Sequence, residues 1–264
     1  MSGTDAEHLP LQQAADELGV HYQTAYRWVR SGQLPAQLVA GKYVVTRDDV
    51  IAVDERRQTP GSPTAPSSKR VARQAARART ALLEGDEPTV RSIARRLTDD
   101  GSSAVELIQS LFVPALRDIG EAWHDGEITV WVEHRASAIA ERILGELAPN
   151  PRGRRRGTAV VAAVAGERHS LPTTMAAIAL REAHWRVEHL GADMPVDELV
   201  RFCGEHDVDV AIISLTSAGS TKLANETAER IRADGTPAIV GGPGRSLDQL
   251  LDEARDATSP GRSS

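Results

Sequence analysis

A segment rich in proline, glycine and serine, TPGSPTAPSSKR, interrupts the chain early and constrains its fold more than any other feature. This composition offers almost no apolar surface for a core, so we interpret residues 58–70 as a linker. A second interruption, PRGRRRG, occupies residues 151–157 and is interpreted as a basic linker. A chain of 264 residues with these two breaks is predicted to form several small domains rather than one large core.

The charge and cysteine content exclude several kinds of protein. With 31 Lys and Arg against 37 Asp and Glu, the net charge is -6, so any contact with nucleic acid has to be local. The single cysteine, Cys203, excludes an internal disulfide and a CxxC zinc site. The longest apolar run, Ala159 to Ala165, is too short to cross a bilayer, and the first residues do not form a secretion signal. We therefore expect a cytoplasmic protein without a membrane partner.

The first 57 residues are predicted to form two short helices, a hairpin and a closing helix. Apolar residues recur at helical spacing from Leu11 to Leu18, Gly19-Val20 breaks this helix, and a second helix follows from His21 to Val29. Two β-prone runs flank Ala40-Gly41 in QLVAGKYVVT, and Asp48-Asp49 starts the closing helix. This order is typical of a helix-turn-helix domain, whose second helix enters the major groove of DNA.

The second helix divides its side chains between a core and an outer face. Ala25, Trp28 and Val29 are expected to face inward. The candidate DNA-contacting side chains, on this helix and on the hairpin, are Tyr22, Gln23, Arg27, Arg30 and Lys42. The order of these pieces resembles the winged helix-turn-helix domains of the MerR and excisionase type. This resemblance implies a double-stranded operator DNA as partner.

A three-helix interaction module is the alternative interpretation of this domain. Residues 1–57 contain six Lys and Arg but eight Asp and Glu. A single copy is therefore expected to bind DNA weakly, because counterion release from phosphate contacts supplies much of the affinity. Assembly would multiply the contacts, so we expect a homo-oligomer.

Residues 71–150 are predicted to form a bundle of four helices. The helical stretches are VARQAARARTALLEG, EPTVRSIARRLTDD, AVELIQSLFVPALRDIGEAWHDG and TVWVEHRASAIAERILGEL. Pro114 is expected to kink or re-phase the third helix, because proline cannot complete the backbone hydrogen bonds of a helix interior. A plain dimerisation unit is the alternative interpretation of the bundle.

Residues 158–255 alternate short apolar strands with amphipathic helices. This alternation predicts a doubly wound parallel sheet, an α/β fold in which ligands bind at the carboxyl ends of the strands. The loops at those ends are residues 166–172, 214–220 and 241–245. The first loop contains Glu167 and His169, and a carboxylate that orients an imidazole is typical of metal-bound histidines.

These loops and the bundle resemble the CarH/LitR type of light-sensing, cobalamin-dependent regulators over about residues 8–254. GERHSLP, SLT and the pair Gly241-Gly242 resemble, in this order, the motifs of cobalamin-binding domains. In the bundle, Trp123 is followed after nine residues by Glu133-His134, which resembles the helical cap of that family. The cofactor-binding residues that the resemblance implies are Trp123, His124, Glu133, His134, Glu167, His169, Ser214, Thr216, Gly241 and Gly242.

The resemblance also implies separate roles for the two faces of the cofactor. Below cobalt, His169 would be the metal ligand, Glu167 would hydrogen-bond it and Ser214 would continue this relay. The glycine pair would leave room for the displaced nucleotide tail. Above cobalt, Trp123 would pack over the adenosyl group, and His124 would become the second metal ligand once light has removed that group.

Two departures from the family pattern leave alternatives open. Pro172 stands where the motif has glycine, so the turn after the ligand loop is expected to be stiffer. The chain ends in RDATSPGRSS without the usual fifth strand and closing helix, so the sheet is expected to be one strand short. A regulator that has lost the cofactor and responds to a protein partner is one alternative. A corrinoid methyl carrier is the other, although the N-terminal domain argues against it.

The sequence thus predicts a multidomain chain that combines a winged helix-turn-helix, an all-α four-helix bundle and an α/β sheet. The predicted segments are a DNA-binding domain at 1–57, a linker at 58–70, a cobalamin cap at 71–150, a basic linker at 151–157, a cobalamin-binding domain at 158–255 and a disordered tail at 256–264. We expect no enzyme activity but a transcriptional regulator controlled by adenosylcobalamin, with methylcobalamin as the other candidate. The resemblance implies a tetramer in the dark that light dissociates.

Overall fold

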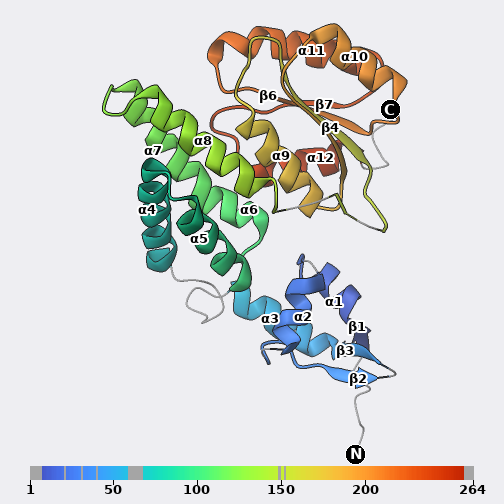
Figure 1. Cartoon of the computed structure of the whole chain (residues 1–264). Helices are drawn as coiled ribbons and strands as arrows, with labels where there is room; N and C mark the ends of the chain where they lie inside the picture. Colours follow the sequence, from blue (N-terminus) through green and yellow to red (C-terminus); the bar gives the residue numbers. More distant parts are fainter. Residues whose placement is uncertain are drawn as a thin grey trace, which may run out of the picture. The chain divides into compact units, whose positions relative to one another are not determined.

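The computed structural model describes residues 8–20, 22–30, 32–39, 41–58, 68–147, 150–151 and 153–258, with the elements labelled in Figure 1. Its contacts divide the chain into two compact units. One contains Met1–Gln74 and Ser92–Ser103, and the other contains Ala75–Arg91 and Ala104–Ser264. Among the described helices, none has both the length and the apolar character that crossing a membrane requires.

The first unit contains a small domain of three helices and a three-stranded antiparallel sheet. Its elements are β1 (His8–Pro10), α1 (Leu11–Glu17), α2 (Tyr22–Arg30), β2 (Gln37–Val39), β3 (Lys42–Thr46) and α3 (Arg47–Gln58). The sheet has the order β1-β3-β2, and one core unites helices and sheet through residues such as Leu11, Trp28 and Val45. The predicted helix-turn-helix and hairpin are confirmed. The sequence did not predict β1, because a strand of three residues carries too little periodicity.

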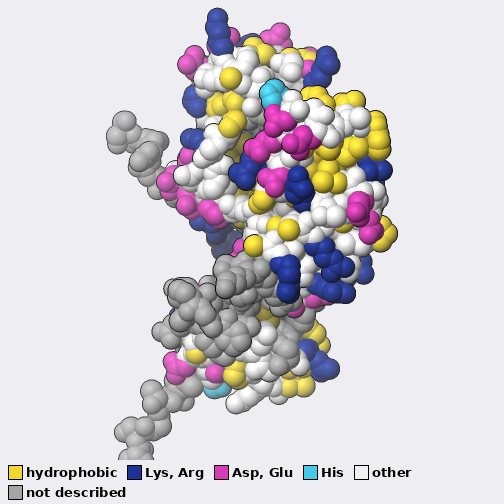
Figure 2. Space-filling model, turned by 90° about the vertical axis from the view of Figure 1, so that its left-hand side faces the viewer, with side chains coloured by type: hydrophobic (Ala, Val, Ile, Leu, Met, Phe, Trp, Pro, Cys, Tyr) yellow, Lys and Arg dark blue, Asp and Glu magenta, His cyan; other side chains and the backbone are white. Residues whose placement is uncertain are grey.

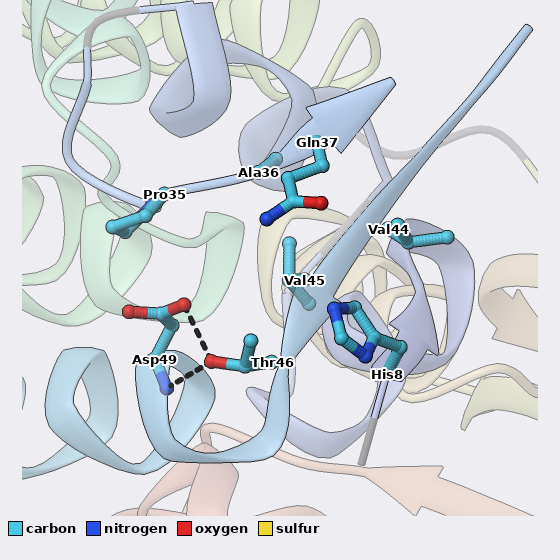
Figure 3. Close-up of a pocket in the computed structure, with 8 residues that line it drawn as sticks. All are labelled: His8, Pro35, Ala36, Gln37, Val44, Val45, Thr46 and Asp49. Carbon is cyan, nitrogen blue, oxygen red and sulfur yellow. Dashed lines mark hydrogen bonds between the residues drawn. The ribbon is translucent and has the colours of Figure 1, made fainter. Parts of the chain in front are cut away.

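Short-range interactions begin and end these helices. Gly19 has a φ of +63°, a left-handed conformation that suits glycine at the end of α1. At the start of α3, the Thr46 hydroxyl accepts from the backbone N–H of Asp49 at 3.2 Å and donates to the Asp49 carboxylate at 2.5 Å. Figure 3 shows this pair beside a small pocket that His8 and Gln37 also border. Both polar side chains of the pair are thus engaged in starting the helix.

The middle region is helical throughout. Its elements are α4 (Ser68–Glu84), α5 (Glu87–Asp99), α6 (Ala104–Leu107), the π-helical turn η1 (Ile108–Phe112), α7 (Val113–His124) and α8 (Val130–Leu144). Pro114 lies in the first turn of α7, directly after η1. A π turn holds one more residue than an α turn and shifts the face of every later side chain. The predicted re-phasing of the third helix at Pro114 is therefore confirmed.

The C-terminal region is a four-stranded parallel sheet covered by helices on both faces (Figure 1). Its elements are β4 (Thr158–Val164), α9 (Leu171–Glu182), β5 (Arg186–Met194), α10 (Val196–Glu205), β6 (Val210–Ser214), η2 (Ala218–Ser220), α11 (Thr221–Ala233), β7 (Ala238–Val240) and α12 (Leu247–Thr258). The strand order is β5-β4-β6-β7, and α9 and α12 share one core with the sheet. Helices α10 and α11 share the other core. The predicted α/β fold is confirmed.

The bundle is attached to this sheet domain through polar contacts at the start of α6. The Glu182 carboxylate, at the end of α9, accepts from the backbone N–H groups of Ala104 at 2.7 Å and Val105 at 2.9 Å. These N–H groups lie in the first turn, where a helix has no carbonyl partners of its own. The Gln109 amide also donates to Asp248 on α12 at 2.9 Å.

Several predicted segment boundaries need correction. α3 reaches Gln58 and α4 begins at Ser68, so both ends of the predicted linker 58–70 are helical. α12 continues to Thr258, so the predicted disordered tail is wrong for residues 256–258. The helices extend further because these end residues can continue the backbone ladder without an apolar partner. Residues 59–67 and 259–264 lie outside the described part of the chain.

Within the described part of the chain, β7 pairs only with β6 and therefore lies at the edge of the sheet. Pro237 and Gly241 direct their polar backbone groups toward β6, so Ala238 and Val240 direct theirs outward. The Arg232 guanidinium donates to the Ala238 carbonyl at 2.6 and 3.0 Å, and Arg245 donates to the Val240 carbonyl at 2.7 Å. Charged side chains that occupy an edge hinder pairing with another strand. Two arginines thus occupy the outward carbonyls of the edge strand β7.

We predict that the double substitution Arg232→Ala and Arg245→Ala increases self-association of the protein without cofactor, because it frees two edge carbonyls. Light scattering over a concentration series measures this effect. The matched control is Arg201→Ala with Arg230→Ala, which removes two exposed arginines that pair with the carboxylates of Glu198 and Asp197. Equal association of both double variants would show that the arginine caps do not protect the edge.

Candidate cofactor site and DNA-binding face

The candidate cofactor site lies where the order of the parallel strands reverses. The chain leaves β4 for β5 on one side and later returns to β6 on the other. The loops after β4 and β6 therefore diverge, and such a switch point is where doubly wound sheets bind ligands. The loop after β4 carries Glu167 and His169, and the loop after β6 carries Thr216 and Ser217.

Glu167 is buried between these two loops, with 1% of its surface exposed. One carboxylate oxygen accepts from the backbone N–H groups of Thr216 at 2.8 Å and Ser217 at 3.0 Å. The other oxygen contacts His169, at 3.3 Å from its backbone nitrogen and 2.5 Å from ring Nδ1. A single side chain thus joins the two loops.

These contacts keep the Glu167 carboxylate ionised. Burial is the largest single influence and favours the neutral acid. Hydrogen bonds from the backbone of Thr216, the ring of His169 and the backbone of Ser217 together outweigh burial and lower the pKa from 4.5 to about 2. An anion beside Nδ1 holds a proton on that nitrogen, so the unprotonated nitrogen of the neutral ring is Nε2.

The His169 ring is held at one nitrogen and accessible at the other. Its side chain is 69% exposed, and within the described part of the chain Nε2 has no hydrogen-bond partner. The Thr216 hydroxyl lies 2.8 Å from Nδ1 and adds a second support. An oriented imidazole with an accessible Nε2 fits the requirement for a ligand to a metal such as cobalt.

The structure differs from the relay expected at Ser214. This residue is buried at the end of β6, with 8% exposed, and is not among the described partners of Glu167 or His169. The hydroxyl beside the histidine ring belongs to Thr216 instead. Side chains of a strand alternate between faces, so residues 214 and 216 are equivalent in period and only the loop geometry separates them.

The glycine pair and Pro172 both fit their surroundings. A β-carbon on Gly242 would lie 3.2 Å from the side chain of Leu215, whereas one on Gly241 would meet nothing closer than 3.8 Å. A side chain on Gly242 would therefore have to displace the Leu215 side chain by a few tenths of an ångström. Pro172 lies in the first turn of α9, where a helix does not use the missing N–H, so it starts α9 without breaking it.

The cap residues gather near the turn between α7 and α8. Trp123 is 47% exposed, and His124 is the exposed last residue of α7. On α8, the Glu133 carboxylate lies 2.7 Å from His134 Nδ1 and accepts from the Ser137 hydroxyl at 2.7 Å. Figure 2 shows hydrophobic side chains, in yellow, between the charged ones on one side of the molecule. Val130 and Trp131 are further exposed apolar residues of α8, which the sequence analysis did not single out.

The DNA-binding face agrees in part with the residues selected from the sequence. Arg30 and Lys42 are exposed, and Ala25 and Trp28 are buried as predicted. Tyr22 packs partly against the core instead of lying fully outside. The side chains of Gln23 and Arg27 lie outside the described part of the chain.

Tyr26, on the same helix, was not predicted from the sequence as part of this face. Its ring is 36% exposed and lies 6.3 Å from the Tyr22 ring and 5.7 Å from the Tyr43 ring. The spacing of Tyr22 and Tyr26, four residues apart on one helix, was the available signal. The aromatic cluster joins the second helix to the hairpin.

Comparison with known proteins also separates a helix-turn-helix domain from the cofactor-binding region. The family described as B12 binding domain matches residues 74–148 and 157–258, and the helix-turn-helix domain family matches residues 9–57. The HTH-type transcriptional repressors CarA and CarH of Myxococcus xanthus are 31% and 30% identical to this chain, over 61% and 56% of its length. The matches span 54% and 51% of the two repressors, about half of each.

A solved structure also shares the fold. The monomethylamine corrinoid protein of Methanosarcina barkeri aligns with a TM-score of 0.53 over 69% of this chain and 93% of its own, at 17% identity. The family matches, together with this fold, define a B12-binding protein that also carries a helix-turn-helix domain. More particularly, the chain belongs to the CarH-type cobalamin-binding transcriptional regulators.

We predict that ionised Glu167 makes the stability of the protein without cofactor depend on pH. Its pKa is lowered to about 2 in the folded state, so its contribution is present above pH 4.5 and is lost as the pH falls toward 2. Urea unfolding at a series of pH values should show that this loss is absent in Glu167→Gln. Glu205→Gln removes an exposed carboxylate and is the control. Identical pH dependence in wild type and Glu167→Gln would contradict the role assigned to the buried anion.

Proposed function

We propose that this chain binds adenosylcobalamin and that light, by acting on the bound cofactor, controls its affinity for an operator DNA. The observation that carries the proposal is the exposed His169 ring with Nδ1 fixed by a buried anion, in a chain that begins with a helix-turn-helix domain. The similarity to the CarA and CarH repressors supports the same function. The domain boundaries predicted from the sequence, corrected at their helical ends, are proposed as the functional segments.

The chain's own residues have distinct proposed tasks at the cofactor. His169 would hold the metal through Nε2, while Glu167 keeps the ring in the required tautomer and Thr216 supports it. Adenosylcobalamin supplies a cobalt–carbon bond that light can break. Trp123 and His124, at the end of α7, would contact the bound cofactor together with Glu133 and His134.

Assembly is the proposed link between the cofactor and DNA. A sensor changes DNA affinity only if its two states differ in something that the DNA-binding domain senses. The N-terminal domain has a net negative charge, so several copies acting together would bind DNA far more strongly than one. We propose a tetramer in the dark and its dissociation in light.

Two other functions are candidates, and the measurements given in the next two paragraphs test them as well. A corrinoid methyl carrier is favoured by the fold shared with the monomethylamine corrinoid protein, but such a carrier has no need of a DNA-binding domain. Methylcobalamin is the corresponding alternative cofactor. A regulator that has lost the cofactor would leave the oriented imidazole of His169 without a task.

We expect the protein loaded with adenosylcobalamin in the dark to be larger than the same sample after green light, and to release DNA on illumination. Light scattering and an operator-binding assay, run beside the visible absorption spectrum, measure this.

His169→Ala should bind the cofactor more weakly, and His124→Ala should give a less persistent light product. Unchanged size and DNA affinity after demonstrated photolysis would exclude control by light. A protein that takes up methylcobalamin but not adenosylcobalamin would favour the methyl carrier.

We also expect Arg30→Ala to weaken operator binding and to lower the salt dependence of binding by about one unit of slope, as for one lost phosphate contact. A titration at several salt concentrations measures the slope. Arg201→Ala makes the same change of charge on α10 of the sheet domain and should have no effect. If both variants bind DNA like the wild type, Arg30 does not contact DNA.

A further inference from the structure

The end of β5 has an unusual backbone next to the proposed cofactor loop. The pairing of β5 with β4 shifts register twice, between Val161 and Ala162 and between Ala162 and Val164. Asp193, near the end of β5, has a φ of +55°, and His184 is the other non-glycine residue with a positive φ in the described part of the chain. Aspartate tolerates this left-handed conformation better than most residues, but at a cost in energy. Strain of this kind persists where the surrounding contacts impose it.

Two hydrogen bonds join Asp193 to the loop that carries Glu167 and His169. The Asp193 carboxylate accepts from the backbone N–H of Gly166 at 2.7 Å. The backbone N–H of Asp193 donates to the carbonyl of Glu167 at 2.9 Å. Asp193 makes both bonds in this left-handed conformation, so it holds the same loop through its backbone N–H and through its side chain.

These bonds complete the support of Glu167. Thr216 and Ser217 hold the carboxylate from the loop after β6, while Asp193 holds the backbone on both sides of the Gly166–Glu167 peptide bond. Gly166 itself has a φ of +87°, so the loop turns sharply at this point. Without the bonds from Asp193, the backbone at this turn would keep the hydrogen bond from the Glu167 N–H to the Val164 carbonyl at 3.0 Å but would hold the His169 ring less firmly.

We infer that Asp193 is a positioning residue that fixes the direction of the His169 ring through Gly166 and Glu167. This inference rests on the proposed function for its consequence, which is tighter histidine ligation of cobalt. Metal sites lose affinity when their supporting groups are removed, because the ligand must then be ordered at the moment of binding. Asp193 acts at the backbone of the loop and touches neither the ring nor its free nitrogen.

Three substitutions separate the roles of the backbone and the carboxylate. Asp193→Asn keeps an acceptor oxygen and tolerates a positive φ, so it should behave like the wild type. Asp193→Gly keeps the backbone conformation but removes the acceptor. Asp193→Ala removes the acceptor and also disfavours the conformation. Thermal unfolding of each variant verifies that the fold is retained.

The first measurement needs no cofactor. NMR amide exchange of Gly166 should be about tenfold faster in Asp193→Gly than in the wild type, because the amide loses a charged acceptor, and should be restored in Asp193→Asn. Exchange that is equally slow in the wild type and in Asp193→Gly would overturn the inference.

The second measurement uses cob(II)alamin and protein labelled with 15N-histidine. The nitrogen hyperfine pattern in the EPR spectrum reports how much of the cobalt is bound by a protein histidine. We expect this fraction and the cobalamin affinity to fall in Asp193→Gly, the affinity by about tenfold, and both to recover in Asp193→Asn. Full histidine ligation with wild-type affinity in Asp193→Gly would refute the positioning role. If the wild type binds no cobalamin, the proposed function fails, and the Gly166 exchange rates still decide whether Asp193 holds the loop.

Discussion

The hydrogen bonds to the buried Glu167 carboxylate are the interaction on which the cofactor site of the sheet domain depends. Burying an ionised group costs several kcal/mol unless polar partners replace its water. Here the backbone of Thr216 and Ser217 replaces that water, and the same contacts fix the loops after β4 and β6. The His169 ring takes its direction from this anion. Glu167 therefore both joins the two loops and orients the His169 ring, so any change at Glu167 affects both.

Much of the fold could be predicted from the sequence, for identifiable reasons. The alternation of apolar strands and amphipathic helices after residue 158 has a strong period, and glycine or proline marks most of the ends. Pro114 indicated that the side-chain phase of the third helix would change, as it does at η1. What escaped prediction were short or end features, such as β1 and the extension of α12 to Thr258. These depend on pairing and on continuation of the backbone ladder, which leave little trace in residue type.

For the candidate site, too, some features could be predicted from the sequence and others could not. Glu167 and His169 lie two residues apart, so their pairing was visible in the sequence and is confirmed by the 2.5 Å contact. A hydroxyl of the relay was expected at Ser214, at the end of β6, but the hydroxyl beside the ring belongs to Thr216 in the loop after β6. Asp193 is distant in sequence and acts through its backbone conformation, which residue type alone does not reveal.

Helix α9 connects the loop that carries His169 with the start of α6. It starts just after the His169 loop and ends at Glu182, which binds the first N–H groups of α6. From there α6, η1 and α7 continue along the chain to Trp123 and His124. A helix of 12 residues is about 18 Å long and resists compression along its axis. A displacement of the His169 loop along that axis would therefore move Glu182 and, through its two hydrogen bonds, the start of α6.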